Sequence, residues 1–340
     1  MSAVDLTPPT LEQIRATAWR IAPYTVRTPV HEWRSPAVAA RFALPTNLHL
    51  KLELFQRTGT FKARGAINNV LALDEEARQR GITAISAGNH AIAAAYAAAC
   101  VGAHAKVVMI ATANPARVAA ARALGAEVVL APDGPTGFKL VEEIVRTEGR
   151  TFIHPFEGPR VTAGTATCGL EFHEQVAGLD AVVVPIGAGG LCSGVGTITK
   201  LLDPKCKVYG VEPQATQVMT KSLAAGSAQT IGQVKTIADS LAPPMTLPYV
   251  FEMCRRSLDE VVLVSDDEMA AAAAILFAEM KLAVEAAAAA STAAAFGPLR
   301  KKLAGKRVGL VICGTNIDAD GSHQLVTRGQ QALATGVLAP

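Results

Sequence analysis

The sequence predicts an α/β protein of two lobes, with parallel-rich twisted sheets flanked by helices. Short runs rich in Val and Ile alternate with Ala-rich segments along most of the chain, and this rhythm is typical of parallel strands with helices on both faces. The length of 340 residues exceeds what one compact core usually supports. Because no Pro- or Ser-rich linker divides the chain, we expect one lobe to be inserted into the other.

The first predicted element is a helix after Thr10, whose capping box with Gln13 precedes apolar residues at helical spacing. Strands and helices then alternate from about residue 81 to 131, and residues 180–212 give a second strand–helix–strand unit. We expect strands at 106–110, 127–130, 181–185, 207–211, 261–264 and 307–312, with helices that include 91–100, 116–124 and 266–280.

Composition and charge exclude several classes of protein. The chain is 50% hydrophobic and 18% charged, as globular proteins are. A formal net charge of +3, from scattered Lys and Arg, argues against nucleic acid or an anionic membrane as a partner. The most apolar run, 286–296, is too short to span a bilayer.

The cysteines and the start of the chain indicate a reducing compartment. The six cysteines are far apart in sequence, so no zinc-binding spacing is present. The first residues, MSAVDLTPPTLEQIR, lack the apolar segment of a signal peptide. We therefore expect free, mostly buried thiols in a cytoplasmic protein.

The segment around Lys62 is the first candidate site. A strand leads into a glycine turn and then into a helix that should begin near Thr60, which places Lys62 in the first helical turn. The positive end of the helix dipole disfavours a cation there, so the side chain is pushed toward the neutral amine that a Schiff-base lysine needs. On this argument alone, a solvated surface lysine is the better interpretation.

Two strand-to-helix turns are candidate anion sites. The loop 86–90 opens a helix, and its backbone N–H groups suit a carboxylate, although an ordinary helix cap is the simpler interpretation. The glycine-rich loop 187–191 suits a phosphate. Cys192 replaces the last glycine of a dinucleotide fingerprint, but Glu212 follows roughly twenty residues on. An NAD-dependent oxidoreductase is therefore one alternative.

A fourth segment ends a strand at Cys313 and Gly314. The end of a strand is where an α/β sheet usually presents its ligand-binding groups. Taken singly, a buried cysteine before a turn is the simpler interpretation.

In this order and spacing, the four segments resemble the fold-type II pyridoxal-phosphate enzymes, in particular the threonine/serine dehydratases (ammonia-lyases), with serine racemase as a relative. The resemblance covers about residues 10–330, and the family pattern T-G-S-F-K-x-R-G-A matches residues 58–66 with Thr60 in place of Ser. It implies the two-lobed fold of the tryptophan synthase β type. The large cofactor-binding domain would comprise residues 1–53 and 155–340, and the small inserted domain residues 54–154.

The resemblance also implies a role for each segment. Lys62 would carry pyridoxal phosphate as a Schiff base and act as the base at the substrate Cα, with Phe61 beside the ring and Cys313 opposite the pyridine nitrogen. Asn89 would bond the ring hydroxyl. The substrate carboxylate would be bound by Ser86, Ala87, Gly88, Asn89 and His90, and the cofactor phosphate by Gly187, Ala188, Gly189, Gly190 and Leu191.

The implied activity is deaminating dehydration of a β-hydroxy amino acid, with L-threonine, L-serine, phenylserine or hydroxyaspartate as candidate substrates. A neutral thiol at the ring nitrogen makes the ring a weaker electron sink than a carboxylate would, which favours expulsion of a β-hydroxyl. Ala87 stands where the racemase has its second base, so racemisation should be absent or slow. β-Replacement and racemisation are the alternatives within the family.

Some positions depart from the family pattern. Glu212 matches an acidic ligand of the family's cation site, but Val218 replaces the Asp, so Glu212 is only a possible ligand and a divalent or monovalent cation is doubtful. Phe156 and the segment 163–167 differ from common relatives, and 284–288 replaces a more usual E-P-x-G, which allows a substrate other than threonine. Relatives suggest a homodimer or homotetramer. A chain that ends at Pro340 is expected to lack the regulatory domain of biosynthetic threonine dehydratases.

Overall fold

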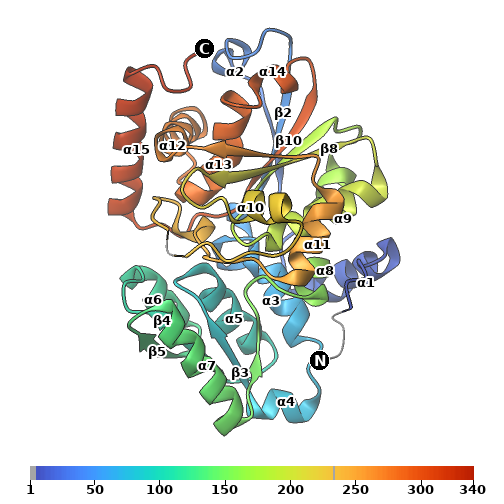
Figure 1. Cartoon of the computed structure of the whole chain (residues 1–340), viewed down its shortest axis with the longest axis vertical. Helices are drawn as coiled ribbons and strands as arrows, with labels where there is room; N and C mark the ends of the chain where they lie inside the picture. The colour runs from blue at the N-terminus through green and yellow to red at the C-terminus, as the bar shows by residue number, and fades with distance from the viewer. Residues whose placement is uncertain (1–4, 233) are drawn as a thin grey trace.

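The computed structural model describes residues 5–232 and 234–340, which form two sheets covered by helices (Figure 1). The larger sheet has the order β1-β2-β10-β7-β8-β9, and the smaller sheet, in the lower half of Figure 1, has the order β5-β4-β3-β6. The strands of the larger sheet are β1 (Val30–Trp33), β2 (Asn47–Leu52), β7 (Ala181–Pro185), β8 (Lys207–Pro213), β9 (Glu260–Val264) and β10 (Arg307–Ile312). Those of the smaller sheet are β3 (Ile82–Ile85), β4 (Ala105–Ile110), β5 (Glu127–Ala131) and β6 (Thr151–Phe152).

Helices cover both sheets, and two Ala-rich ones among them are largely buried. Every residue of α13 is buried, as are most residues of α5. The helices packed with the larger sheet are α1 (Leu11–Ile21), α2 (Pro36–Ala39), α8 (Pro159–Gln175), α9 (Gly190–Leu202), α10 (Val218–Ala225), α11 (Pro248–Ser257), α12 (Asp266–Met280), α13 (Ala286–Phe296), α14 (Arg300–Leu303) and α15 (Ala319–Ala334). Those near the smaller sheet are α3 (Lys62–Val70), α4 (Glu75–Arg80), α5 (Asn89–Cys100), α6 (Pro115–Ala123) and α7 (Gly134–Glu148).

The predicted α/β class with parallel-rich sheets is confirmed. Of the strand pairs formed by the described residues, β1 with β2 is antiparallel and the others are parallel. The central strands β3 and β7 are buried along their whole length, as expected where helices cover both faces of a sheet. The smaller sheet uses a continuous part of the chain, whereas the larger sheet draws strands from either side of it. The exact domain limits stay a prediction.

Most predicted elements occur within a few residues of their expected bounds. The capping box of Thr10 with Gln13 is present, and the strands 181–185 and 307–312 and the helix 266–280 have the expected ends. One start differs: α3 begins at Lys62 and not at Thr60, because Thr60 is extended and forms a bridge with Gly314. The six cysteines are free, and five are buried. Within the described ranges, no helix has the length and hydropathy needed to cross a membrane.

Candidate active site

A cavity of about 310 Å³ lies where the strands of both sheets end. It is lined by Ile85 and Ile110 from β3 and β4, and by Pro185 and Cys313 from the ends of β7 and β10. The carboxyl ends of parallel strands are where open α/β sheets bind ligands. Every cofactor and substrate residue expected from the sequence lines this cavity, namely Phe61, Lys62, Ser86, Ala87, Gly88, Asn89, His90, Gly187, Ala188, Gly189, Gly190, Leu191 and Cys313.

The backbone before Lys62 is bonded to the segment that follows β10. The Phe61 N–H donates to the Cys313 carbonyl oxygen at 3.2 Å, and the Thr315 N–H donates to the Gly59 oxygen at 2.9 Å. Gly59 has a φ of 73°, a left-handed conformation that favours glycine. These bonds set the first turn of α3 beside the end of β10, which is why Lys62 and Cys313 line the same cavity.

The surroundings of Lys62 shift its amine toward the neutral form. Its Nζ donates to the Pro155 carbonyl oxygen at 2.7 Å and lies 5.2 Å from the centre of the Phe61 ring. Burial lowers the pKa of Lys62 to about 8, and the nearby Cys313 and Glu285 oppose part of that shift. Burial raises the pKa of the Cys313 thiol well above its ordinary value, so this thiol is neutral. An amine that titrates near pH 8 suits proton transfer.

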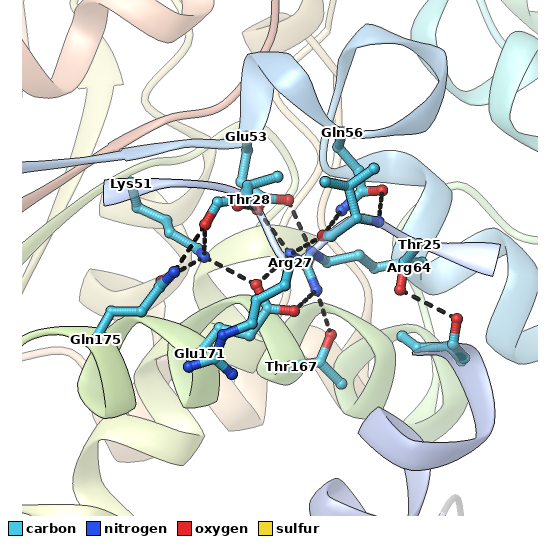
Figure 2. A network of polar contacts seen from close by, with 12 residues as sticks. Thr25, Arg27, Thr28, Lys51, Glu53, Gln56, Arg64, Thr167, Glu171 and Gln175 are labelled. Atoms are coloured by element: carbon cyan, nitrogen blue, oxygen red, sulfur yellow. Dashed lines mark hydrogen bonds and ion pairs between the residues drawn. The ribbon is translucent and has the colours of Figure 1, made fainter. Parts of the chain in front are cut away.

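A buried network of charges anchors the same helix from its other side (Figure 2). The Arg64 guanidinium forms two hydrogen bonds of 2.8 Å with each of Glu53 and Glu171. Lys51 donates to Glu171, to the Thr28 carbonyl oxygen and to Gln175, each at 2.8 Å. We call Lys51, Glu53, Arg64 and Glu171 the buried quartet; it joins β2, α3 and α8 and carries no net charge.

The loop 86–90 has the geometry of an anion site at the start of α5. Gly88 occupies the helix cap position, and none of the side chains that the structure describes caps it, which leaves first-turn N–H groups facing the cavity. A Cβ at Gly88 would lie 2.5 Å from Arg117 Cδ, so a larger residue would displace the Arg117 side chain. His90 donates from Nε2 to the Ile153 oxygen at 2.8 Å, and burial with the neighbouring Lys62 lowers its pKa to about 3. His90 is therefore a neutral support of the loop.

Glu285, Arg117 and Asp239 line the cavity, although they were not among the predicted site residues. The Asn89 amide donates to Glu285 Oε1 at 2.9 Å, Arg117 Nη1 donates to Asp239 Oδ2 at 2.5 Å, and Arg117 Nη2 lies 3.5 Å from Glu285 Oε2. Burial raises the pKa of Glu285 to about 7, against the opposing effect of Arg117. These residues come from α6, a short turn and the start of α13, so sequence spacing gave no sign of the cluster.

The glycine-rich loop forms a close-fitting cradle at the start of α9. A Cβ added to Gly189, whose φ is 108°, would lie 2.7 Å from Val250, and one added to Gly190 would lie 2.9 Å from Phe156 Cβ. No described side chain caps α9. Its first N–H groups can therefore bind a phosphate, and together with Lys62 and Cys313 in the same cavity the residues fit pyridoxal phosphate.

Glu212 lies outside this cavity and acts as a helix cap. Its two carboxylate oxygens accept hydrogen bonds from the Met219 N–H at 2.6 Å, the Thr220 N–H at 2.9 Å and the Thr220 hydroxyl at 2.7 Å. Over residues 5–232 and 234–340, no group of three or more His, Cys, Asp or Glu side chains is arranged to hold a metal. Glu212 is thus committed to the start of α10, which gives no support to a role as a cation ligand.

Residues 21–314 match the sequence model of the family of pyridoxal-phosphate dependent enzymes. The chain belongs to this family. The family assignment, the fold class and the cofactor predicted from the sequence are thereby confirmed.

The chain is similar to several proteins of the family. It is 53% identical over 274 residues to the phenylserine dehydratase of Ralstonia pickettii, across 81% of this chain and 84% of that protein. It is 39% identical over 285 residues to the L-threonine ammonia-lyase of Thermotoga maritima, across 83% of this chain and 70% of that protein. The structure of maize serine racemase superposes with a TM-score of 0.88 at 30% identity, covering 96% of this chain and 100% of that one.

Proposed function

We propose that this enzyme is a deaminating dehydratase (ammonia-lyase), which converts a β-hydroxy amino acid to a 2-oxo acid and ammonia by α,β-elimination. The observation that carries the proposal is Lys62, a buried amine with a pKa of about 8 in a cavity whose strand end presents a neutral thiol, Cys313. Similarity to a phenylserine dehydratase and a threonine ammonia-lyase supports it.

The residues of the cavity divide the work. Bound pyridoxal phosphate supplies an electron sink for the substrate amine, which acidifies the Cα proton. The N–H groups of loop 187–191 would hold its phosphate, Phe61 would lie beside its ring, and the neutral Cys313 thiol would meet the pyridine nitrogen without protonating it firmly. The substrate carboxylate binds to the first N–H groups of α5, within the loop 86–90.

Proton transfer is assigned to Lys62. Its neutral amine takes the Cα proton, and the β-hydroxyl leaves with the electron pair of the Cβ–O bond, as water after it accepts that proton from the Lys62 ammonium. The unsaturated amine that results tautomerises, and water hydrolyses it to the 2-oxo acid and ammonia. The bond from Lys62 Nζ to the Pro155 oxygen keeps this amine oriented in the cavity.

Racemisation is expected to be absent or slow. It needs a second group that delivers a proton from the opposite ring face, and Ala87 offers only a methyl group to the cavity. His90 does not replace such a group, because its Nε2 is bonded to a backbone oxygen and its pKa is about 3. Incubation of L-serine with the enzyme should therefore yield pyruvate and ammonia without D-serine.

The test uses purified holoenzyme and the variant Lys62→Ala. The wild type should release ammonia and 2-oxo acid in equal amounts from a β-hydroxy amino acid, and Lys62→Ala should not. Lys139→Ala, on the exposed face of α7, is the matched control and should keep full activity. Full turnover by Lys62→Ala would refute the assignment, and product formation that depends on added sulfide or phosphohomoserine would indicate β-replacement instead.

We also propose a cytoplasmic homodimer or homotetramer. Five of the six free cysteines are buried, which fits a reducing compartment. Sedimentation equilibrium of the purified enzyme would give its mass relative to the 35.3 kDa chain, and a monomer would contradict the expected assembly.

A further inference from the structure

We propose that the cavity selects an aromatic group at the substrate Cβ, so that the substrates are β-aryl-β-hydroxy amino acids. This inference rests on the proposed function and names its substrate class. It is carried by two sets of apolar residues that line the cavity and by the pairing of its charged groups.

The first wall is formed by Ile85, Ile110 and Phe138, which all line the cavity. Ile85 ends β3 and Ile110 ends the neighbouring parallel strand β4. Helix α7 packs directly on both, because a Cβ added to Gly137 would lie 2.7 Å from Ile85 Cδ1 and 3.5 Å from Ile110 Cδ1. Phe138 follows Gly137 on this helix and is half-buried. We call these three residues the aryl wall.

The aryl wall begins where the substrate carboxylate is proposed to bind. Ile85 directly precedes the loop 86–90, whose N–H groups form the anion site. A substrate held there by its carboxylate carries its Cβ substituent only three bonds from the carboxylate carbon. That substituent therefore reaches the aryl wall without leaving the cavity.

The second wall comes from the segment 241–245, Leu-Ala-Pro-Pro-Met, which lines the same cavity. A Cβ added to Gly187 would lie 3.3 Å from both Leu241 Cα and Pro243 Cδ, so this segment packs on the phosphate loop. A phenyl ring packed against apolar residues of the lining would bury much of the roughly 150–250 Å² that aromatic side chains bury in protein cores. A hydrogen atom or a methyl group at Cβ fills little of that space.

The charged groups of the cavity argue against an acidic substituent. Among the lining residues that the structure describes, the cations are Lys62 and Arg117. Arg117 is paired with Asp239 at 2.5 Å and lies 3.5 Å from Glu285, and its Nε donates to the Asn316 oxygen at 2.9 Å. Lys62 is the proposed base. A second carboxylate on the substrate would therefore be buried without a free cation to pair with it.

The experiment compares L-threo-phenylserine, L-threonine, L-serine and L-threo-3-hydroxyaspartate as substrates of the holoenzyme. A difference of one methylene in an apolar pocket changes kcat/KM by about 10–200-fold, so phenylserine should exceed threonine and serine by at least about tenfold. Phe138→Ala should lower kcat/KM for phenylserine by at least about tenfold and that for serine by less than about threefold. The kcat/KM of Phe138→Leu for phenylserine should fall between that of the wild type and that of Phe138→Ala.

Leu140→Ala is the matched control, since Leu140 lies on the same helix and packs in the same cluster but is not among the described lining residues. A second readout uses ligands that cannot lose a hydroxyl, L-phenylalanine and L-alanine, with Kd taken from the change in visible absorption of the bound cofactor. Phenylalanine should bind at least about tenfold more tightly than alanine, and Phe138→Ala should abolish that preference while Leu140→Ala keeps it.

Two results would overturn the proposed role of the aryl wall in selecting the substrate. One is a wild type that prefers serine or threonine; the other is a Phe138→Ala variant that lowers activity on phenylserine and serine equally. If none of the four amino acids released ammonia, the proposed function would fail. The binding preference for phenylalanine over alanine would still decide whether the aryl wall favours an aromatic group.

Discussion

Two groups of charged residues flank the first turn of α3. In one group ion pairing outweighs the effect of burial on the pKa values, and in the other group burial outweighs ion pairing. The buried quartet surrounds Arg64. The second group, which we call the cavity group, consists of Lys62, Arg117, Asp239 and Glu285. Lys62 lies only two residues before Arg64 in the sequence. In the quartet each charge is matched: burial alone would raise the pKa of Glu53, but Arg64 lowers it below its ordinary value. Likewise Glu53 raises the pKa of Arg64 well above its ordinary value, against the effect of burial. Both shifts favour the charged forms of Glu53 and Arg64.

The cavity group is incompletely matched. Lys62 donates to a neutral carbonyl oxygen, and Glu285 is bonded by the Asn89 amide with Arg117 at 3.5 Å. Burial then prevails, and the pKa values move to about 8 for Lys62 and about 7 for Glu285. Compensated burial gives a rigid anchor, and uncompensated burial gives groups that exchange protons in the physiological range. The anchor holds the helix from which the reactive lysine projects.

The largest effect should come from Lys62→Met. We expect loss of at least about 10³-fold in kcat, because this change removes the proposed base. The free energy of unfolding of the cofactor-free protein should stay the same or rise, since the buried amine is destabilising when charged. Ammonia release and urea denaturation measure the two quantities. A large loss of stability would show that Lys62 is a structural residue.

Arg64→Met should mainly lower the free energy of unfolding, the quantity that Lys62→Met should leave unchanged or raise. Removal of Arg64 leaves Glu53 unpaired and Glu171 with only Lys51 as a cation, so we expect a loss of about 3–5 kcal/mol in the free energy of unfolding by urea. Arg328→Met is the control, because its ion pair with Asp267 is exposed and should contribute no more than about 1 kcal/mol. Equal losses in the two variants would contradict the distinction between anchor and reactive group.

Glu285→Gln should change how stability depends on pH. The pKa of Glu285 is raised from 4.5 to about 7, so between these values the folded chain holds a proton that the unfolded chain has lost. Stability of the cofactor-free protein should therefore fall by up to about 1.4 kcal/mol per pH unit in that interval from this group. The Gln variant should lose this slope; the same slope in both proteins would exclude a raised pKa at Glu285. The lowered pKa of Glu53 acts in the opposite sense, since its stabilisation is lost as pH falls.

The smallest effect is expected from Glu212→Gln, at a third buried carboxylate. Glu212 caps α10 through two N–H groups and a hydroxyl, and loss of a cap costs about 0.5–2 kcal/mol. Activity should be unchanged, and a chelator should have the same effect on wild type and variant. Chelator sensitivity in the wild type alone would assign Glu212 to a cation site after all.

Local sequence gave much of the fold and the principal motifs. The period of Val/Ile runs and Ala-rich segments predicted strands such as 181–185 and 307–312 to the residue, because burial of a parallel strand leaves its mark on consecutive positions. The motif 58–66 indicated the family, which the comparisons confirm. The start of α3 was placed at Thr60 and lies at Lys62, since the bridge from Thr60 to Gly314 spans more than 250 positions and leaves no local signal.

The sequence by itself therefore determined the fold class, the family and the residues of the three loops and the thiol that line the cavity. Only the tertiary structure decided how the charged residues of the cavity are paired and what shape the cavity has. Arg117, Asp239 and Glu285 meet from elements far apart in the chain, and Phe138 joins Ile85 and Ile110 only because α7 packs on β3 and β4. Periodicity and motifs record each residue's own environment, whereas charge pairing and cavity shape depend on which distant residues become neighbours.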